Sequence, residues 1–228
     1  MVTILIADDH EIVRRGLRAM IQEHEGWHVC GEISNGRDAV KAAFEFNPNV
    51  AVLDLLMPCL NGVDTARQIR RGSPDTEVLI LADHANDQLI CEALLAGARG
   101  LVLKSDSSQD LISAVQALSH HRPFFTSGVS EMLVDAYMKM TASPKNLSSS
   151  ILTNREREIV QMIAEGKSNK VVAEALCISV KTVETHRGTV MRKLGINSLV
   201  HLVHYAIRNQ LIEVACAPFS GPRQRFLR

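Results

Sequence analysis

Residues 50–58, VAVLDLLMP, contain a short apolar run that ends at the carboxylate of Asp54. Runs of similar length occur elsewhere in the first 120 residues, at 3–7 (TILIA), 28–33 (HVCGEI), 77–82 (EVLILA) and 100–103 (GLVL). Between them lie segments with apolar residues at helical spacing, at 11–23, 36–46, 63–70, 87–96 and 107–118. Short runs rich in Val, Ile and Leu are typical of parallel strands buried on both faces. The alternation predicts a doubly wound α/β fold with a five-stranded parallel sheet.

Three carboxylates and one ammonium group directly follow the predicted strands. Asp8 and Asp9 come after the first strand, Asp54 ends the third and Lys104 follows the fifth, whereas Ala82 ends the fourth. In such a sheet the carboxyl ends of the strands meet at one edge, where ligands bind. Carboxylates that lie close together repel one another and stay ionised only with a cation, and such oxygen ligands suit Mg²⁺. The sequence therefore predicts a magnesium site at this edge.

From residue 152 onward the pattern is helical. Thr153 precedes Glu156 by three residues, which is a capping box at the start of a helix that runs to Glu165. A short helix from residue 168, a turn at 177–179, a helix to Leu194 and a fourth helix at about 198–209 follow. A short helix and a basic helix joined by a tight turn form a helix-turn-helix. We therefore predict a small all-α domain of four helices.

The two halves of the chain have opposite net charge. The 228 residues include 25 basic and 25 acidic ones. Residues 1–122 contain 11 basic and 17 acidic residues, a net charge of −6, and residues 147–228 contain 12 and 6, a net charge of +6. The length fits two domains, and a basic domain favours a polyanion such as nucleic acid as its partner.

The change in composition sets the predicted domain bounds. We expect one domain at 1–122 and the helix-turn-helix domain at 151–212. Between them we expect a linker at 123–150, which begins with a helix at 127–140. The helix leads into the segment TASPKNLSSS, whose Ser, Pro and Asn residues are typical of flexible chain. The basic tail at 213–228 is expected to be disordered.

Cysteine usage and the first residues indicate the compartment. The five cysteines are scattered and none forms a CxxC pair, which argues against a disulfide framework or a zinc finger and favours a reducing cytosol. The first apolar run is too short for the core of a signal peptide or a membrane span. We therefore expect a cytoplasmic protein without a membrane partner.

Both halves resemble known families. The segments IADDH, AVLDLLMP and GLVLK resemble the receiver domain of two-component response regulators, which has a flavodoxin-like fold. Residues 152–196, LTNREREIVQMIAEGKSNKVVAEALCISVKTVETHRGTVMRKLGI, resemble the LuxR-type helix-turn-helix. Their order resembles the NarL/FixJ class of bacterial response regulators. This resemblance implies a transcription regulator rather than an enzyme. It also implies a sensor histidine kinase, double-stranded DNA and a second copy of the chain as partners, and allows RNA polymerase as a further one.

The resemblance also implies roles for individual residues. Asp54 would be the phosphoacceptor, and Lys104 would pair with the phosphoryl oxygens. The side chains of Asp9 and Asp54 and the carbonyl of Leu56 would bind Mg²⁺, with Asp8 behind them. This agrees with the chemistry, since a carboxylate that attacks a phosphoryl group needs cations to balance the charge on its oxygens.

Two positions depart from the usual receiver pattern. Receivers normally have Ser or Thr where this chain has Ala82, and an aromatic residue where it has Leu101. Ala82 has no hydroxyl group to donate to the phosphoryl group, and Leu101 has no ring to rotate inward. We therefore hypothesise a weakened phosphorylation switch. The alternative is a DNA-binding regulator independent of phosphorylation, whose degenerate receiver serves dimerisation or partner binding.

The helix at 181–194 is the expected recognition helix, and its N-terminal part should enter the major groove of DNA. Glu184, Thr185 and Gly188 share one face, with Lys181 a turn earlier, and the resemblance implies that this face contacts the bases. We interpret Thr182, Arg187, Arg192 and Lys193 as phosphate contacts. The resemblance also implies that two copies of the chain form a homodimer through the helix at 198–209.

A hydrolase of the haloacid-dehalogenase type is the alternative from another class of protein, since it also combines an α/β fold with an aspartate nucleophile. Such enzymes need a second aspartate two residues after the first. Leu56 occupies that position here, which makes the hydrolase interpretation poor.

Overall fold

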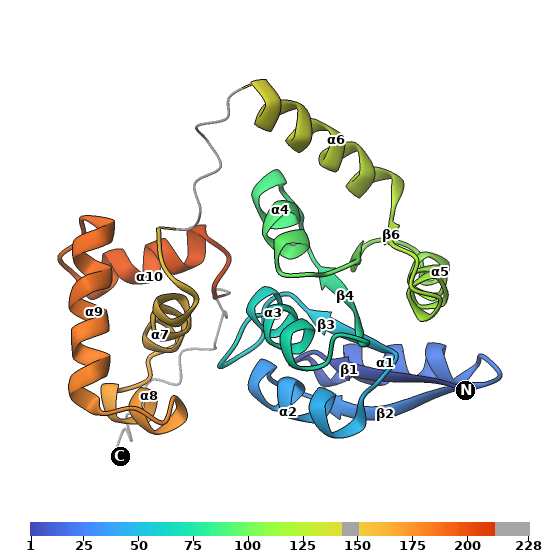
Figure 1. Cartoon of the computed structure of the whole chain (residues 1–228), viewed down its shortest axis with the longest axis horizontal. Helices are drawn as coiled ribbons and strands as arrows, with labels where there is room; N and C mark the ends of the chain where they lie inside the picture. The colour runs from blue at the N-terminus through green and yellow to red at the C-terminus, as the bar shows by residue number, and fades with distance from the viewer. Residues whose placement is uncertain (143–150, 213–228) are drawn as a thin grey trace, which may run out of the picture.

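The computed structural model describes residues 1–142 and 151–212, which form an α/β part and a helical part (Figure 1). The α/β part contains a parallel sheet with the strand order β2-β1-β3-β4-β5-β6. The strands are β1 (Val2–Ala7), β2 (Trp27–Ile33), β3 (Val50–Asp54), β4 (Glu77–Ala82), β5 (Gly100–Leu103) and β6 (Phe124–Phe125). The order of the first five strands is that of a doubly wound flavodoxin-like sheet, as the sequence predicts.

The two edges of the sheet have features that the sequence pattern did not indicate. After the fifth helix, His121 adopts a left-handed backbone with φ of 57°, and the chain turns back so that Phe124 and Phe125 pair with Gly100 and Leu101 as a sixth strand. At the other edge the register between β1 and β2 shifts by one residue, because Ile4 pairs with Val29 and Leu5 pairs with Gly31. Cys30 is therefore the extra residue of a bulge.

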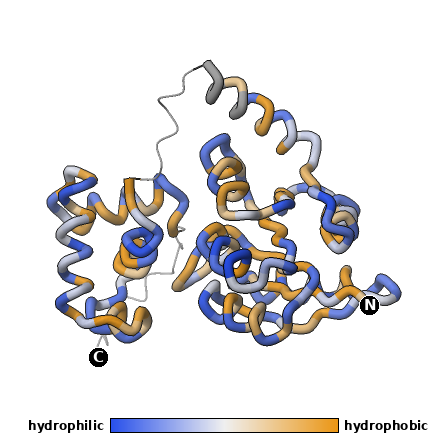
Figure 2. Tube along the Cα trace, viewed as in Figure 1, coloured by the Kyte–Doolittle hydropathy of each residue, from blue (hydrophilic) through white to orange (hydrophobic). Residues whose placement is uncertain are grey.

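Five helices cover the two faces of the sheet: α1 (Glu11–Gln22), α2 (Gly36–Phe46), α3 (Gly62–Gly72), α4 (Asp87–Leu95) and α5 (Ser108–Ser119). Buried residues of α1 and α5 pack on one face, and those of α2, α3 and α4 pack on the other. Figure 2 shows the hydrophobic strands between these layers. Asn35, Asn61 and Asn86 cap α2, α3 and α4 by accepting a hydrogen bond from a backbone N–H of the first turn.

A sixth helix, α6 (Ser127–Ala142), continues two residues beyond the predicted helix and lies beside α4 (Figure 1). Val129 is fully buried, and Met132 and Leu133 pack against the same core as α2 to α4. The predicted flexible segment and the basic tail fall on residues 143–150 and 213–228, which lie outside the described residues.

The helical part consists of α7 (Asn154–Ala164), α8 (Asn169–Ala175), α9 (Val180–Leu194) and α10 (Leu199–Arg208) around one apolar core. The predicted capping box is present, because Thr153 accepts from the backbone of Glu156 and the Glu156 side chain accepts from the backbone of Thr153. Gly195, with φ of 65°, ends α9 in the left-handed conformation.

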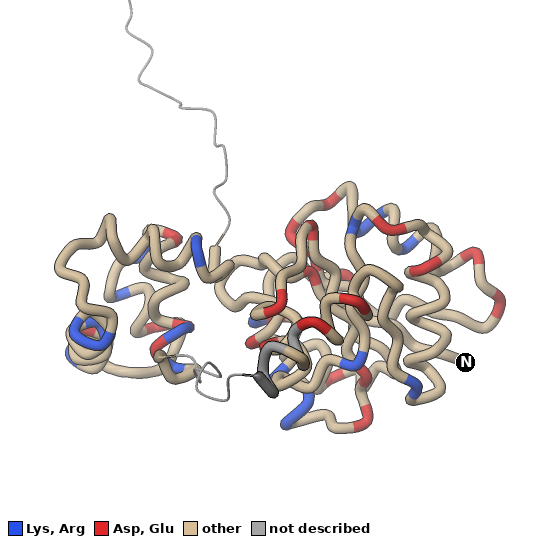
Figure 3. The backbone as a smooth tube through the Cα atoms, turned by 90° about the horizontal axis from the view of Figure 1, so that it is seen from above, with Lys and Arg blue, Asp and Glu red and all other residues tan. Residues whose placement is uncertain are grey.

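The helix α7 lies between the sheet domain and α9, so that α9 is on the far side of the molecule (Figures 1 and 3). Four polar residues of α7 are buried, namely Glu156, Arg157, Glu158 and Gln161. Three of them, Arg157, Glu158 and Gln161, contact the sheet domain. Within the part of the chain that the structure describes, none of the helices combines the length and the apolar character that crossing a bilayer would need.

Candidate functional site

The carboxyl ends of β1, β3 and β5 bring together the acidic residues and the lysine that the sequence predicts there. The Nζ atom of Lys104 lies 2.9 Å from Oδ1 of Asp54 and 3.1 Å from Oδ2 of Asp8. Asp8 is fully buried and Asp54 is 3% exposed. One ammonium group therefore bridges two carboxylates that are removed from solvent.

Backbone contacts hold these side chains in place. The N–H of His10 donates to Oδ1 of Asp8 at 2.8 Å, and the guanidinium of Arg14 donates to the Asp8 carbonyl at 2.7 Å. The N–H of Lys104 donates to the Ala82 carbonyl at 2.8 Å. Gly62 begins α3 against the back of the site, and a Cβ there would lie 2.2 Å from the Asp54 carbonyl oxygen.

The pocket disfavours the charge on Asp54. Burial and the repulsion by Asp8 raise the pKa of Asp54 to about 7, although Lys104 acts in the opposite direction. Burial alone would lower the pKa of Lys104, but its hydrogen bond with Asp54 and the charges of Asp54 and Asp8 outweigh burial and raise it above the usual range. The site thus contains more negative charge than a single lysine balances.

The three carboxylates of the site fit a hard divalent cation, whereas the imidazole of His10 beside them is not a ligand that such a cation prefers. One side-chain ligand atom from each of Asp8, Asp9, His10 and Asp54 lies within 4.8 Å of the others. The buried Oδ2 of Asp8 lies 3.1 Å from the Nζ atom of Lys104, which is its ion-pair partner. Carboxylate oxygens with open positions are what Mg²⁺ prefers. Leu56, whose carbonyl completes the predicted set, lies in the loop after β3. Sequence reasoning missed His10, although it directly follows the two aspartates.

The two unusual positions are buried and apolar. Ala82 is the last residue of β4, fully buried, and pairs with Leu103. Leu101 is 1% exposed within β5 and pairs with Phe125 of the additional strand. The structure therefore places neither a hydroxyl group nor an aromatic ring at these two positions.

The predicted recognition helix is α9, and Ser179 caps it by accepting from the N–H of Thr182 at 3.0 Å. The predicted DNA-contacting residues are exposed at Lys181, Glu184, Thr185, Gly188, Arg192 and Lys193, and half-buried at Thr182 and Arg187. Figure 3 shows basic residues on this helix and acidic residues predominating in the sheet domain. The sheet domain does not cover the outer face of α9.

One predicted phosphate contact already has a partner. The Nζ of Lys193 lies 2.7 Å from Oε2 of Glu156, whose side chain is 5% exposed. This ion pair links α9 to α7 within the helical domain. Lys193 therefore serves the packing of the domain in this structure, whereas Arg192 is exposed and its guanidinium donates to the Thr189 hydroxyl at 3.5 Å.

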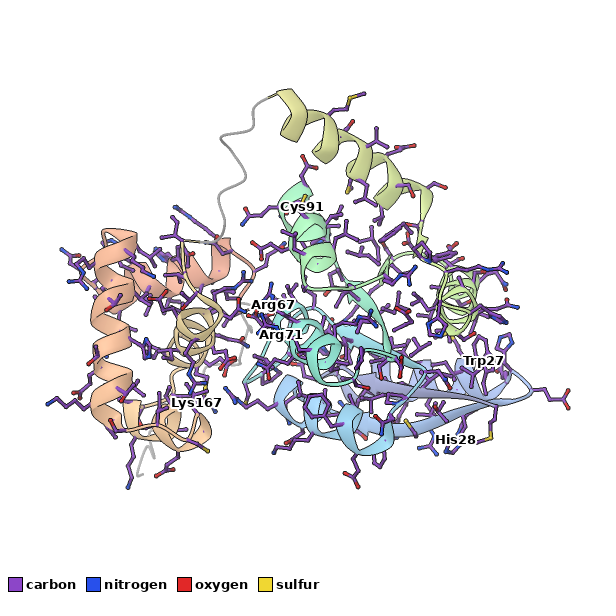
Figure 4. All side chains as sticks on the ribbon, in the orientation of Figure 1. Trp27, His28, Arg67, Arg71, Cys91 and Lys167 are labelled. Atoms are coloured by element: carbon purple, nitrogen blue, oxygen red, sulfur yellow. The ribbon has the colours of Figure 1, made fainter. Side chains whose placement is uncertain are left out.

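Interdomain contacts form a further group of functional candidates that sequence reasoning missed. Arg157 of α7 is 6% exposed and lies 2.9 Å from Glu92 of α4 and 3.6 Å from Asp64 of α3. Glu158 accepts from Gln68 at 2.9 Å and pairs with Arg37 at 3.4 Å. Figure 4 shows Arg67 and Lys167 at this boundary between the two domains.

Comparisons with known proteins match both parts of the chain. Residues 4–116 match the response regulator receiver domain, and residues 150–206 match the bacterial regulatory proteins of the luxR family. The chain is 34% identical over 213 residues to the transcriptional regulatory protein LiaR of Bacillus subtilis strain 168. This alignment covers 93% of this chain and 100% of LiaR.

Two solved structures are similar over most of the chain. One is RcsB from Salmonella enterica serovar Typhimurium, bound to promoter rprA in the presence of the phosphomimetic BeF3−. It has a TM-score of 0.59 and 25% identity, covering 90% of this chain and 97% of that one. The other contains two RcsB dimers bound to two parallel DNAs, with a TM-score of 0.55 and 27% identity, covering the same shares of each chain.

Proposed function

The chain belongs to the bacterial response regulators that join a receiver domain to a LuxR-family DNA-binding domain, and on this basis we propose that Asp54 is its phosphoacceptor. The protein is a DNA-binding transcriptional regulator of a two-component system. One observation supports the assignment of Asp54 most strongly. Its buried carboxylate, at the carboxyl end of the central strand β3, shares Lys104 with the buried carboxylate of Asp8.

The side chains of the pocket have distinct proposed roles. The carboxylate of Asp54 attacks the phosphorus of the donor, so that a new O–P bond forms while the bond from phosphorus to the donor breaks and its electron pair stays with the donor; Lys104 then pairs with the phosphoryl oxygens. Asp9, Asp54 and the Leu56 carbonyl would hold Mg²⁺, and Asp8 would support them from the buried side. When bound, the cation balances the charge that spreads over the equatorial oxygens during transfer. The proposed natural donor is a sensor histidine kinase.

The proposed output is sequence-specific binding of double-stranded DNA by α9. The exposed N-terminal part of this helix faces away from the receiver domain, which leaves it free to enter a major groove. RcsB binds DNA as a dimer, and we propose a homodimer for this chain, which would bind two half-sites about one helical turn apart. A transcription regulator of this kind acts in the cytoplasm, and we propose RNA polymerase as a further partner.

The proposed domain division assigns residues 1–122 to the receiver and 151–212 to the DNA-binding domain. Val129 lies in the proposed linker at 123–150, but its side chain is fully buried in the core of the receiver. This burial supports assigning the first part of α6 to the folded receiver domain.

The buried, apolar Ala82 and Leu101 favour a second candidate function, namely DNA binding that does not depend on phosphate. A hydrogen bond to a charged group contributes about 1.5–3 kcal/mol, and Ala82 cannot provide one. The receiver would then serve dimerisation or partner binding.

DNA binding by the full-length protein decides between the two functions. Wild type and Asp54→Ala are compared with and without Mg²⁺ plus a small phosphodonor, on sites obtained by in-vitro selection. If Asp54 is the phosphoacceptor and the switch works, the donor tightens binding tenfold or more for wild type and leaves Asp54→Ala unchanged. Equal binding by both proteins in every condition would establish the phosphate-independent regulator instead.

Gly188 offers a direct test of the DNA-binding face. It is exposed on α9, and apart from its chain neighbours and the surrounding backbone of the helix none of the described atoms lies within 4 Å of a Cβ placed there. Gly188→Arg is expected to tighten DNA binding several-fold and to steepen the slope of log K against log salt by about 0.9, because the added positive charge lies in the field of the DNA phosphates and displaces about one counterion. Gly188→Ala is the control, since it raises helix propensity without adding charge. An unchanged slope for Gly188→Arg would place this face away from DNA.

A further inference from the structure

The loop between β3 and α3 is held by a side chain of the DNA-binding domain. The amide nitrogen of Gln161 in α7 donates to the carbonyl of Met57 at 2.8 Å. Its amide oxygen accepts from the backbone N–H of Asn61 at 2.9 Å. Gln161 is 1% exposed, so these bonds are shielded from water. A single side chain thus bridges both ends of the segment from Met57 to Asn61.

Glu165, one turn further along, holds the middle of the same segment. The N–H of Cys59 donates to Oε1 of Glu165 at 3.0 Å, and Gln161 donates to the same oxygen at 2.9 Å. Cys59 has φ of 69°, a left-handed backbone that a non-glycine residue adopts only when its surroundings hold it there. We call Gln161 and Glu165 the α7 clamp.

The clamped segment adjoins the phosphoacceptor pocket. Leu55, the residue after Asp54, is fixed to the sheet because its N–H donates to the Leu81 carbonyl at 2.8 Å and its carbonyl accepts from Gly62 at 2.7 Å. Between this anchor and Met57 lies Leu56, whose carbonyl is the proposed backbone ligand of the cation. The position of that carbonyl therefore depends on an anchor in the receiver on one side and on the α7 clamp on the other.

We propose that Gln161 and Glu165 are positioning residues for the cation site of the receiver, so that cation binding beside Asp54 and docking of the DNA-binding domain strengthen each other. This inference rests on the proposed function of the Asp54 pocket. Linkage is reciprocal, because a contact that favours the cation-bound form of the loop is itself favoured when the cation binds. The coupling reaches α7 through the backbone after β3 and needs no group at Ala82 or Leu101.

Other interdomain contacts provide matched controls. Gln68 donates to Glu158 at 2.9 Å across the same boundary, and no hydrogen bond connects this pair to the loop backbone among the described residues. Gln68→Ala therefore removes an interdomain hydrogen bond of similar length to those of Gln161, but leaves the α7 clamp intact. Glu165→Gln keeps an oxygen that accepts from Cys59, whereas Glu165→Ala removes it.

The experiment measures Mn²⁺ binding to the full-length chain by electron paramagnetic resonance, with Mg²⁺ as competitor. Gln161→Ala and Glu165→Ala are expected to weaken Mn²⁺ binding by about fivefold to tenfold. Gln68→Ala and Glu165→Gln are expected to stay within twofold of wild type. Thermal unfolding of each variant checks that its fold is intact, and the two alanine variants test the clamp independently of each other.

Hydrogen exchange of residues 57–61 provides the second measurement. Mg²⁺ is expected to slow exchange of the Cys59 and Asn61 amides in wild type, and the slowing is expected to be lost in Gln161→Ala. Equal Mn²⁺ affinity in wild type and both alanine variants would overturn the inference, and so would an equal loss in Gln68→Ala. If wild type itself binds no Mn²⁺, or binds it unchanged after Asp54→Ala, the proposed function of the pocket fails instead.

Discussion

Asp54→Asn is expected to stabilise the receiver domain, and to do so increasingly as the pH rises from about 4 to about 7. The pKa of Asp54 is raised from 3.8 to about 7 by burial and by the charge of Asp8. In the unfolded chain the carboxyl group is already ionised above pH 4, so folding at neutral pH must either bury the charge or take up a proton. Asparagine is neutral throughout and avoids this penalty.

Urea unfolding in the presence of a chelator, at pH values from 4 to 8, measures the difference between variant and wild type. We expect it to be small at pH 4 and to reach about 2–4 kcal/mol above pH 7. Mg²⁺ should reduce the difference by stabilising the ionised wild type. The matched control is Asp83→Asn, which changes an exposed aspartate in the next loop. If the gain in unfolding free energy of Asp54→Asn does not depend on pH, the pKa of Asp54 is not raised by its surroundings and the prediction is wrong.

Gly62→Ala is expected to destabilise the receiver domain by about 3 kcal/mol or more, because the new methyl group meets backbone rather than a flexible side chain. A Cβ at Gly62 would lie 2.2 Å from the Asp54 carbonyl oxygen and 3.0 Å from the Leu55 Cα. To relieve this contact, α3 must move away from β3. The substitution should therefore also lower the affinity of the Asp54 pocket for divalent cations.

Gly16→Ala in α1 is the matched control, with the same chemical change in a helix of the same domain. Gly16 is exposed, and apart from its chain neighbours and the surrounding backbone of α1 none of the described atoms lies within 4 Å of a Cβ placed there. Alanine there should stabilise the domain by about 0.5–1 kcal/mol through helix propensity. Urea unfolding of the two variants should thus give changes of opposite sign. If Gly62→Ala unfolds like wild type, α3 is not packed as closely on β3 as the structure shows.

The sequence predicts the fold well because the strands are simple in pattern. Runs such as 50–53 are apolar throughout, as buried parallel strands must be, and the helices α2 to α5 begin at Asn or Ser caps. The convergence of Asp8, Asp54 and Lys104 follows from topology alone, because the carboxyl ends of parallel strands share one edge.

The contacts between domains could not be predicted in the same way. Gln161 and Arg157 occupy polar positions on an amphipathic helix, where an exposed side chain would be expected, and only the tertiary arrangement buries them. The additional strand consists of two residues, Phe124 and Phe125, which is too short to show a period. The ion pair of Lys193 with Glu156 likewise depends on the packing of α9 on α7, which the sequence pattern does not show, and the phosphate contact of Lys193 stays a prediction.

The edges of the sheet bear on how the receiver avoids aggregating with its own copies. An open edge strand displays unpaired backbone groups that can pair with another molecule. Here one edge is β6, only two residues long, and the other is β2, which is distorted by the bulge at Cys30 and includes the charged Glu32. A short edge and a bent edge give a neighbouring strand little length over which to align. Newly made copies can therefore crowd together in the cell without their sheets joining into a continuous one.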